Sequence, residues 1–132
     1  MHGGGVTREE GGFFTRLAAR LGAAGVASLR FDLRGHGESD GRQQDLTLSA
    51  ILNDIRAAII HICGLAGAES VSLLGTSFTG GITGYFAAKC PGLLTHLVML
   101  NPLLNYKKRF IDDKPYWFHG QIDEGAGREL TE

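Results

Sequence analysis

The 132-residue sequence has little proline, little cysteine and almost no excess charge. It contains 3 Pro, and its 20 Gly follow no triplet repeat, which excludes a collagen-like chain and a proline-rich linker. Lys and Arg number 13 against 14 Asp and Glu, so the net charge is −1. A balance of this kind creates no strong field toward nucleic acid or an anionic membrane, and we expect neither partner.

Long apolar runs and paired cysteines are also missing. No run approaches the roughly 20 apolar residues that a membrane span requires, and no signal-peptide pattern opens the sequence. Cys63 and Cys90 lie in apolar helical patterns without a CxxC pair, so we expect reduced, buried thiols and no disulfide. The sequence predicts a cytoplasmic protein without a cofactor or a metal ion.

Three short apolar segments, each bounded by Gly or Pro, are predicted to be buried strands. They are residues 26–33, 70–75 and 96–101. Strands that are apolar throughout and separated by helices indicate parallel pairing, with helices covering the faces of the sheet. The length and the 43% hydrophobic content suit one domain of modest size. The predicted fold class is therefore α/β.

Helical periodicity fills the regions between these strands. An amphipathic pattern over residues 13–24 predicts a helix with Gly25 as a left-handed C-cap. A second helix is predicted to start after Thr47 as its N-cap and to end at Gly64. A third is predicted from about residue 78 to 89, and its glycines would permit close approach to a sheet.

A tight turn with the sequence GTSFTGG follows the second predicted strand. Such a strand-to-helix turn strains its central residue, Ser77, and needs small residues two positions away, here Gly75 and Thr79. The usual motif is G-x-S-x-G, so Thr79 departs from it. Two alternatives remain: Ser77 only caps the helix, or the turn is centred on Thr79 between Ser77 and Gly81.

The HGGG segment at residues 2–5 is typical of a loop that presents a backbone N–H to a developing oxyanion. Glycine permits the close approach of the backbone that this requires. Each such donor typically stabilises the transition state by about 2.7–4 kcal/mol. We expect the N–H groups of Gly4 and Phe78 to form the pair. A flexible glycine-rich terminus is the alternative interpretation.

The loop FDLRGHGESDG at residues 31–41 is the third motif. With HGGG before it and the Ser77 turn after it, the sequence resembles the α/β-hydrolase superfamily over about residues 2–105. The similarity is to the branch of feruloyl and cinnamoyl esterases and serine aminopeptidase-like lipases. It implies a serine hydrolase in which Ser77 attacks small-molecule carboxylic esters, and it makes His36 a loop-shaping residue. From their chemistry, Asp32 can accept backbone N–H groups in the turn, and Arg34 can pair with a carboxylate.

A serine hydrolase also needs a histidine base, which in this superfamily follows the nucleophile in the chain. The histidines after Ser77 are His96 and His119. His96 is predicted at the start of the third strand, away from the strand ends that carry the motifs, and His119 has no strand end to position it. We therefore expect neither to act as the base.

The carboxylate that orients the base is equally hard to place. In a minority of the superfamily the carboxylate directly follows the strand after the nucleophile helix. This sequence has Asn101 followed by Pro102 at that position, and an amide supplies no charge. Asp112 and Asp113 are predicted to be solvated loop residues. The resemblance places the Asp and His of the triad beyond residue 132.

The resemblance also implies a strand before His2, lying between those predicted at 26–33 and 70–75. We therefore expect residues 1–105 to be a partial α/β-hydrolase core and residues 106–132 to begin a cap, with little or no activity in isolation. Five aromatic residues suggest the start of a lid or the packing of that cap: Tyr106, Phe110, Tyr116, Trp117 and Phe118.

Two other functional classes compete with an esterase. A truncated product or pseudoenzyme that binds a ligand or partner would retain the turn without catalysis, and the missing triad residues favour it. A nucleotide-binding domain is disfavoured, because neither GxGxxG nor GxxxxGK[ST] follows any predicted strand.

Overall fold

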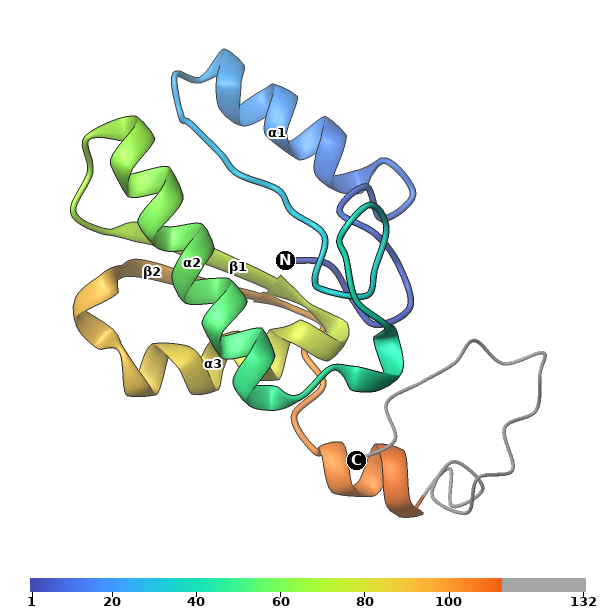
Figure 1. The fold of residues 1–132 in the computed structure, drawn as a ribbon. Helices are drawn as coiled ribbons and strands as arrows, with labels where there is room; N and C mark the ends of the chain where they lie inside the picture. Colours follow the sequence, from blue (N-terminus) through green and yellow to red (C-terminus); the bar gives the residue numbers. More distant parts are fainter. Residues whose placement is uncertain (113–132) are drawn as a thin grey trace.

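Two parallel strands form the centre of the computed structural model, which describes residues 1–112 (Figure 1). Strand β1 spans Val71–Thr76 and strand β2 spans Leu94–Leu100, and the two pair in parallel along their length. Helix α3, Ser77–Lys89, connects the strands and packs along both. The predicted α/β class, with a parallel sheet and flanking helices, is confirmed.

Helix α2, Leu48–Ala66, buries its apolar stripe in the same core as α3. Ile51, Ile55 and Ile59 recur at i, i+4 and i+8 and are almost completely buried. Among the helices within residues 1–112, α2 has a length and a mean hydropathy, 1.4, that would suit a membrane span. Its buried isoleucines show that this apolar character contributes to the core.

The ends of α2 follow local capping chemistry. The Thr47 hydroxyl accepts the Ala50 N–H at 3.1 Å, which confirms the predicted N-cap. The predicted end at Gly64 is wrong, because the helix continues to Ala66 and Gly67 adopts the left-handed conformation at φ 64°. Gly64 is tolerated inside the helix, while the turn that needs a positive φ comes three residues later.

Helix α1, Phe13–Ala23, matches the predicted amphipathic segment. Gly25 follows it at φ 77°, the left-handed conformation expected beyond a helix end. Short turns of helix complete the described chain: 3₁₀ helices at Gln43–Asp45 and Pro91–Leu93, and a π-helix at Lys108–Asp112.

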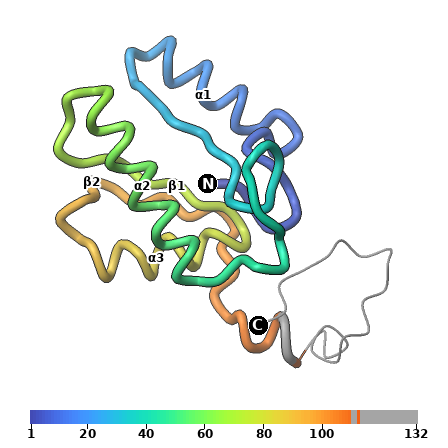
Figure 2. The backbone as a smooth tube through the Cα atoms, viewed as in Figure 1, coloured from blue at the N-terminus to red at the C-terminus, as the bar shows by residue number. Residues whose placement is uncertain are grey.

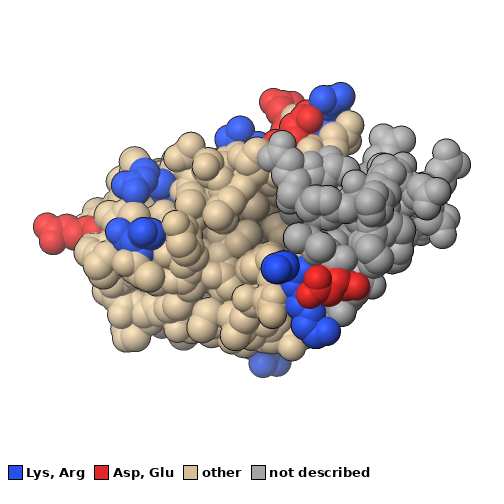
Figure 3. Space-filling model, turned by 90° about the horizontal axis from the view of Figure 1, so that it is seen from below, with Lys and Arg blue, Asp and Glu red and all other residues tan. Residues whose placement is uncertain are grey.

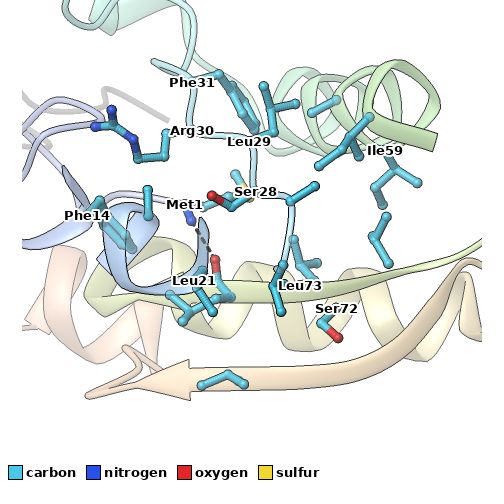
Figure 4. Close-up of a pocket in the computed structure, with 18 of the residues that line it drawn as sticks. Met1, Phe14, Leu21, Ser28, Leu29, Arg30, Phe31, Ile59, Ser72 and Leu73 are labelled. Atoms are coloured by element: carbon cyan, nitrogen blue, oxygen red, sulfur yellow. Dashed lines mark hydrogen bonds between the residues drawn. The ribbon is translucent and has the colours of Figure 1, made fainter. Parts of the chain in front are cut away.

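The prediction of a strand at residues 26–33 is wrong. This segment is extended but belongs to no sheet, and among the described residues the sheet has only β1 and β2. Backbone conformation alone does not make a strand, because a strand needs a neighbour to complete its hydrogen-bond ladder. Here a groove separates the segment from β1 (Figure 4); on its two sides, Met1 bonds to Leu74 of β1 and His2 bonds to Leu33.

Strand β2 is more exposed than a buried parallel strand would be. Val98, Met99 and Leu100 keep 41%, 43% and 36% of their surface exposed, since β2 forms an edge of the described sheet. Cys63 and Cys90 are free thiols, as predicted, but they are half-buried and not fully enclosed.

The glycines of α3 contact two different parts of the chain. A Cβ on Gly84 would lie 3.2 Å from the Met99 sulfur, so this glycine faces the sheet as predicted. A Cβ on Gly80 would lie 2.7 Å from the Pro102 Cβ, and one on Gly81 would lie 2.1 Å from the Leu103 carbonyl oxygen. These two glycines therefore admit the segment that follows β2.

Several charged side chains within residues 1–112 form ion pairs with one another. Arg34 pairs with Asp54, and Arg42 pairs with Asp45. On the face seen in Figure 3, acidic and basic side chains are scattered, and much of the described surface between them is uncharged.

Candidate functional site

Ser77 lies at the point where β1 turns into α3. It is exposed and has φ 47°, a left-handed conformation that is strained for a residue with a side chain. Thr76 occupies the N-cap position of α3, so Ser77 is not the capping residue. A Cβ on Gly75 would lie 2.5 Å from the Thr83 hydroxyl oxygen, which explains the glycine before the turn. The turn therefore holds one strained serine at the surface.

Thr79 is completely buried beneath this turn. Its hydroxyl oxygen lies 2.9 Å from the His2 carbonyl oxygen and 3.2 Å from those of Met1 and Thr76. The same oxygen accepts the Thr76 N–H at 3.3 Å. A turn centred on Thr79 does not fit this burial, because no substrate can reach the hydroxyl. Thr79 instead connects α3 to the start of the chain.

The glycine-rich segment at residues 2–5 lies directly against the turn. A Cβ on Gly3 would be 3.4 Å from the Ser77 Cβ, and one on Gly4 would be 3.3 Å from the Phe78 Cβ. The structure thus brings Gly4, Ser77 and Phe78 together from segments more than 70 residues apart. Glycine at positions 3 and 4 allows the two backbones to approach this closely.

Glu10 joins the same two segments and was missed in the sequence. One carboxylate oxygen accepts the Gly3 N–H at 2.9 Å and the Thr76 hydroxyl at 3.0 Å. Glu10 has φ 41°, and Gly11 and Gly12 follow at 62° and 81°, so three successive left-handed residues lead into α1. In the sequence, Gly11 and Gly12 before α1 indicate a tight turn. They do not indicate that the turn directs the Glu10 side chain to the site.

His2 fixes the glycine-rich segment from the other side. Its Nε2 accepts the Leu33 N–H at 3.0 Å, so the proton is on Nδ1, which donates to the Gly3 carbonyl at 2.8 Å. Burial lowers the pKa of His2 below its usual value, because the charged ring would lose its water. The neutral ring is therefore a structural link between residue 33 and the site.

Asp32 organises the loop that follows. It accepts the backbone N–H groups of Arg8 and Glu38 at 2.6 and 3.1 Å, and the Arg8 guanidinium lies 2.8 Å away. Burial by itself would raise the pKa of Asp32, but these N–H groups and the Arg8 charge outweigh it and hold the pKa below its usual value. A Cβ on Gly37 would come within 2.3 Å of the carboxylate. The predicted role as a backbone acceptor is confirmed.

Arg34 has the predicted ion pair with a carboxylate, and His36 bonds within the loop through its backbone. Arg34 pairs with Asp54, with its closest nitrogen 2.7 Å from the carboxylate. His36 is buried, its N–H donates to the Leu33 carbonyl, and its carbonyl accepts the Ser39 N–H, both at 2.9 Å. Figure 2 shows this loop folded against the N-terminal segment.

The described residues supply no histidine to the Ser77 hydroxyl. Both ring nitrogens of His2 are engaged elsewhere, and His96 lies near the start of β2, 3.2 Å from the Ser72 hydroxyl. Asn101 directly follows β2, and Asp112 ends the π-helix. His119 and Asp113 lie outside the described residues.

Tyr106 packs on the turn. Its ring lies edge-on to Phe78 with centroids 5.8 Å apart, and its hydroxyl donates to the Phe78 carbonyl. Tyr106 therefore packs against the turn itself. The side chains of Phe110 and of the aromatic residues at 116–118 lie outside the described part.

Comparisons with known proteins identify the family of this chain. A family model described as serine aminopeptidase, S33, matches residues 1–125. A monoacylglycerol lipase of Mycolicibacterium smegmatis is 34% identical over 102 residues, which is 74% of this chain and 35% of the lipase. An uncharacterized protein of Mycobacterium tuberculosis is 31% identical over 70 residues, 53% of this chain and 19% of that protein. The chain belongs to the serine aminopeptidase S33 family of α/β-hydrolases.

Proposed function

We propose that this chain carries the nucleophile and the oxyanion hole of an ester hydrolase. Ser77 Oγ would attack the acyl carbon, and the N–H groups of Gly4 and Phe78 would stabilise the oxyanion that forms. The observation that carries the proposal is the exposed, strained Ser77 packed against the glycine-rich segment. Strain of this kind persists only where surrounding contacts enforce it, and it concentrates at functional sites.

The proposed substrate is an uncharged ester of an acyl group with a small alcohol. The monoacylglycerol lipase relative supports this class, although the chain spans only 35% of that protein's length. A direct comparison of a monoacylglycerol with a short aryl ester as substrate distinguishes a preference for long acyl groups from general ester hydrolysis.

Labelling with a serine-reactive phosphonate tests the nucleophile. The native chain should be labelled, Ser77→Ala should not, and Ser49→Ala, which removes an exposed serine on α2, should be labelled like the native chain. Equal labelling of the native chain and Ser77→Ala would reject Ser77 as the nucleophile.

A second candidate is a non-catalytic protein that retains the turn. The positions of the described histidines favour it, because none supplies a base to Ser77. Without a base, the oxyanion hole and substrate binding still provide a small part of the rate enhancement. Labelling would then be slow but would still depend on Ser77. Complete absence of labelling over a wide range of pH would support the non-catalytic alternative.

A further inference from the structure

The segment that follows β2 leaves the sheet beside the start of α3 (Figure 1). Asn101 turns the chain out of β2 with φ 45°, a left-handed conformation that asparagine tolerates better than most residues. Because Leu100 pairs with Thr76 in the sheet, Asn101 follows β2 at the level at which Ser77 follows β1. The turn at Asn101 therefore leads the chain onto the turn at Ser77.

Two hydrogen bonds attach this segment to the turn at Ser77. The Leu103 N–H donates to the Ser77 carbonyl at 2.8 Å. Three residues later, the Tyr106 hydroxyl donates to the Phe78 carbonyl. The glycines of α3 that admit the segment allow this close approach, since a Cβ at either position would overlap it. The Leu103 N–H is thus held in a fixed place on the turn.

The bond from Leu103 reaches the peptide group whose N–H is proposed for the oxyanion hole. The Ser77 carbonyl and the Phe78 N–H belong to one planar peptide unit. A carbonyl has two lone pairs, so the Ser77 carbonyl can accept from Leu103 and from α3 together. A hydrogen bond to the C=O of a peptide polarises the unit and makes its N–H a stronger donor. Hydrogen bonds in such chains strengthen one another by about 10–30% per bond.

We propose that Leu103 is a positioning residue for ester hydrolysis at Ser77. Its N–H polarises and orients the peptide between Ser77 and Phe78, so that the Phe78 N–H binds the oxyanion more strongly. The inference rests on the proposed function, in which this N–H stabilises the oxyanion. Leu103 acts through the peptide and not by contact with the substrate. The segment after β2 is thereby coupled to the strength of the oxyanion hole.

A backbone ester tests this role without changing a side chain. Leucic acid, the hydroxy acid of leucine, replaces Leu103, so an oxygen atom takes the place of the N–H. We expect the nitrogen chemical shift of the Phe78 amide to move to lower frequency, because its peptide loses polarisation. The same ester at Leu104 keeps the Leu103 N–H and should leave the Phe78 shift in place. An unchanged Phe78 shift in the Leu103 ester would overturn the proposal, whatever the effect on stability.

Labelling by the serine-reactive phosphonate measures the consequence for the reaction. Loss of a whole oxyanion donor typically slows a reaction by about 10²–10³-fold, so the weakening of one donor by about 10–30% corresponds to labelling that is about two- to eightfold slower. The Leu103 ester should show this loss at saturating phosphonate, with an unchanged concentration for the half-maximal rate. A loss that comes only from weaker binding of the phosphonate would contradict the proposal.

Leu103→Pro and Leu103→Ala form a second, matched pair. Leu103 packs against the core, so both variants lose side-chain contacts, but only proline lacks the backbone N–H. Leu103→Ala should keep the native Phe78 shift and the native labelling rate at saturation, whereas Leu103→Pro should behave like the ester. Equal behaviour of the two variants would assign the effect to packing and would overturn the proposal.

The two measurements separate this proposal from the proposed function. The Phe78 shift is measured on the unlabelled chain, so it does not depend on whether Ser77 is a nucleophile. If the native chain is not labelled at Ser77, the proposed function fails, and the Phe78 shift alone decides whether Leu103 polarises the peptide. If the shift moves while the native chain and the Leu103 ester are labelled at equal rates, the bond does not serve the reaction and the proposal fails.

Discussion

At the scale of single residues, Thr79 and Glu10 explain how a glycine-rich segment is held in one place. Thr79 meets the carbonyl groups of Met1 and His2, and Glu10 accepts the N–H of Gly3. A backbone with three successive glycines has little intrinsic preference for one conformation, so these side chains supply the constraint. Thr79, which stands where the usual motif has glycine, thus supplies a hydroxyl that bonds to the start of the chain.

Removal of the Thr79 hydroxyl should destabilise the chain. Thr79→Val keeps the shape but leaves buried carbonyl groups with one donor fewer, which costs about 1–3 kcal/mol in the free energy of unfolding. Thr79→Ser keeps the hydroxyl and should lose less. Urea denaturation of the two variants is the measurement, and a Val variant as stable as the Ser variant would contradict the role of the hydroxyl.

The stability of the chain should fall as the pH drops below the ordinary pKa of histidine. His2 is neutral in the fold because burial lowers its pKa, whereas the unfolded ring takes up a proton near pH 6.5. The unfolded state thus binds more protons below that pH, and one such group contributes at most about 1.4 kcal/mol per pH unit. Its contribution is complete above pH 6.5 and declines as the pH falls toward the folded pKa.

Replacement of His2 isolates this effect. His2→Gln should show a shallower loss of stability between pH 7.5 and 5.5 than the native chain, at the cost of lower stability at pH 7.5. His61→Gln, at an exposed position on α2, is the matched control and should keep the native slope. An unchanged slope in His2→Gln would exclude His2 as the titrating group.

At the scale of elements, the helices were predictable and the strands only in part. The helix periods and the Thr47 cap depend on residues within a few positions of each other, so the pattern places them well. Residues 26–33 have the composition of a strand, but strand formation depends on a neighbour that the pattern does not reveal. The exposure of β2 could not be predicted for the same reason, because an edge strand and a central strand can have similar sequences.

The buried apolar stripe of α2 is expected to supply much of the stabilisation that this helix gives to the folded chain. Ile55 is completely buried and Ile60 is 66% exposed on the same helix, so the two positions form a matched pair. Ile55→Ala should lower the free energy of unfolding by about 2–5 kcal/mol, whereas Ile60→Ala should change it by about 0.5 kcal/mol or less. Thermal and urea unfolding would measure both, and similar losses would show that α2 does not pack as described.

At the scale of the whole molecule, contacts between distant segments assemble the site. Gly4, Ser77 and Phe78 were predictable as a group, because each lies in a motif with a known function. The contacts of Glu10 with Gly3 and Thr76 were not, because no local pattern encodes a side chain that reaches across 66 residues of sequence. Sequence thus identified the groups proposed for the chemistry and missed a residue that holds them together.

The segment after β2 depends on the same kind of contact. A Cβ on Gly81 would overlap the Leu103 carbonyl oxygen, so Gly81→Ala should displace this segment and lower the free energy of unfolding by about 1–3 kcal/mol. Gly92→Ala adds a Cβ that meets nothing within 4 Å and serves as the control. Faster proteolysis between residues 101 and 106 in Gly81→Ala alone would confirm the contact, and identical cleavage patterns would argue against it.

The bonds from Met1 and His2 to β1 and α3 also set the order in which the chain can fold. They join residues 73 to 78 positions apart, so these bonds cannot form until the turn at Ser77 exists, although His2 can already bond to Leu33 and Gly3 to Glu10. During synthesis at about 5–20 residues per second, the glycine-rich segment waits for several seconds before that turn is made. Closing so long a loop is entropically costly, and we expect the glycine-rich segment to dock late in folding, after α2, β1 and α3 have formed their core.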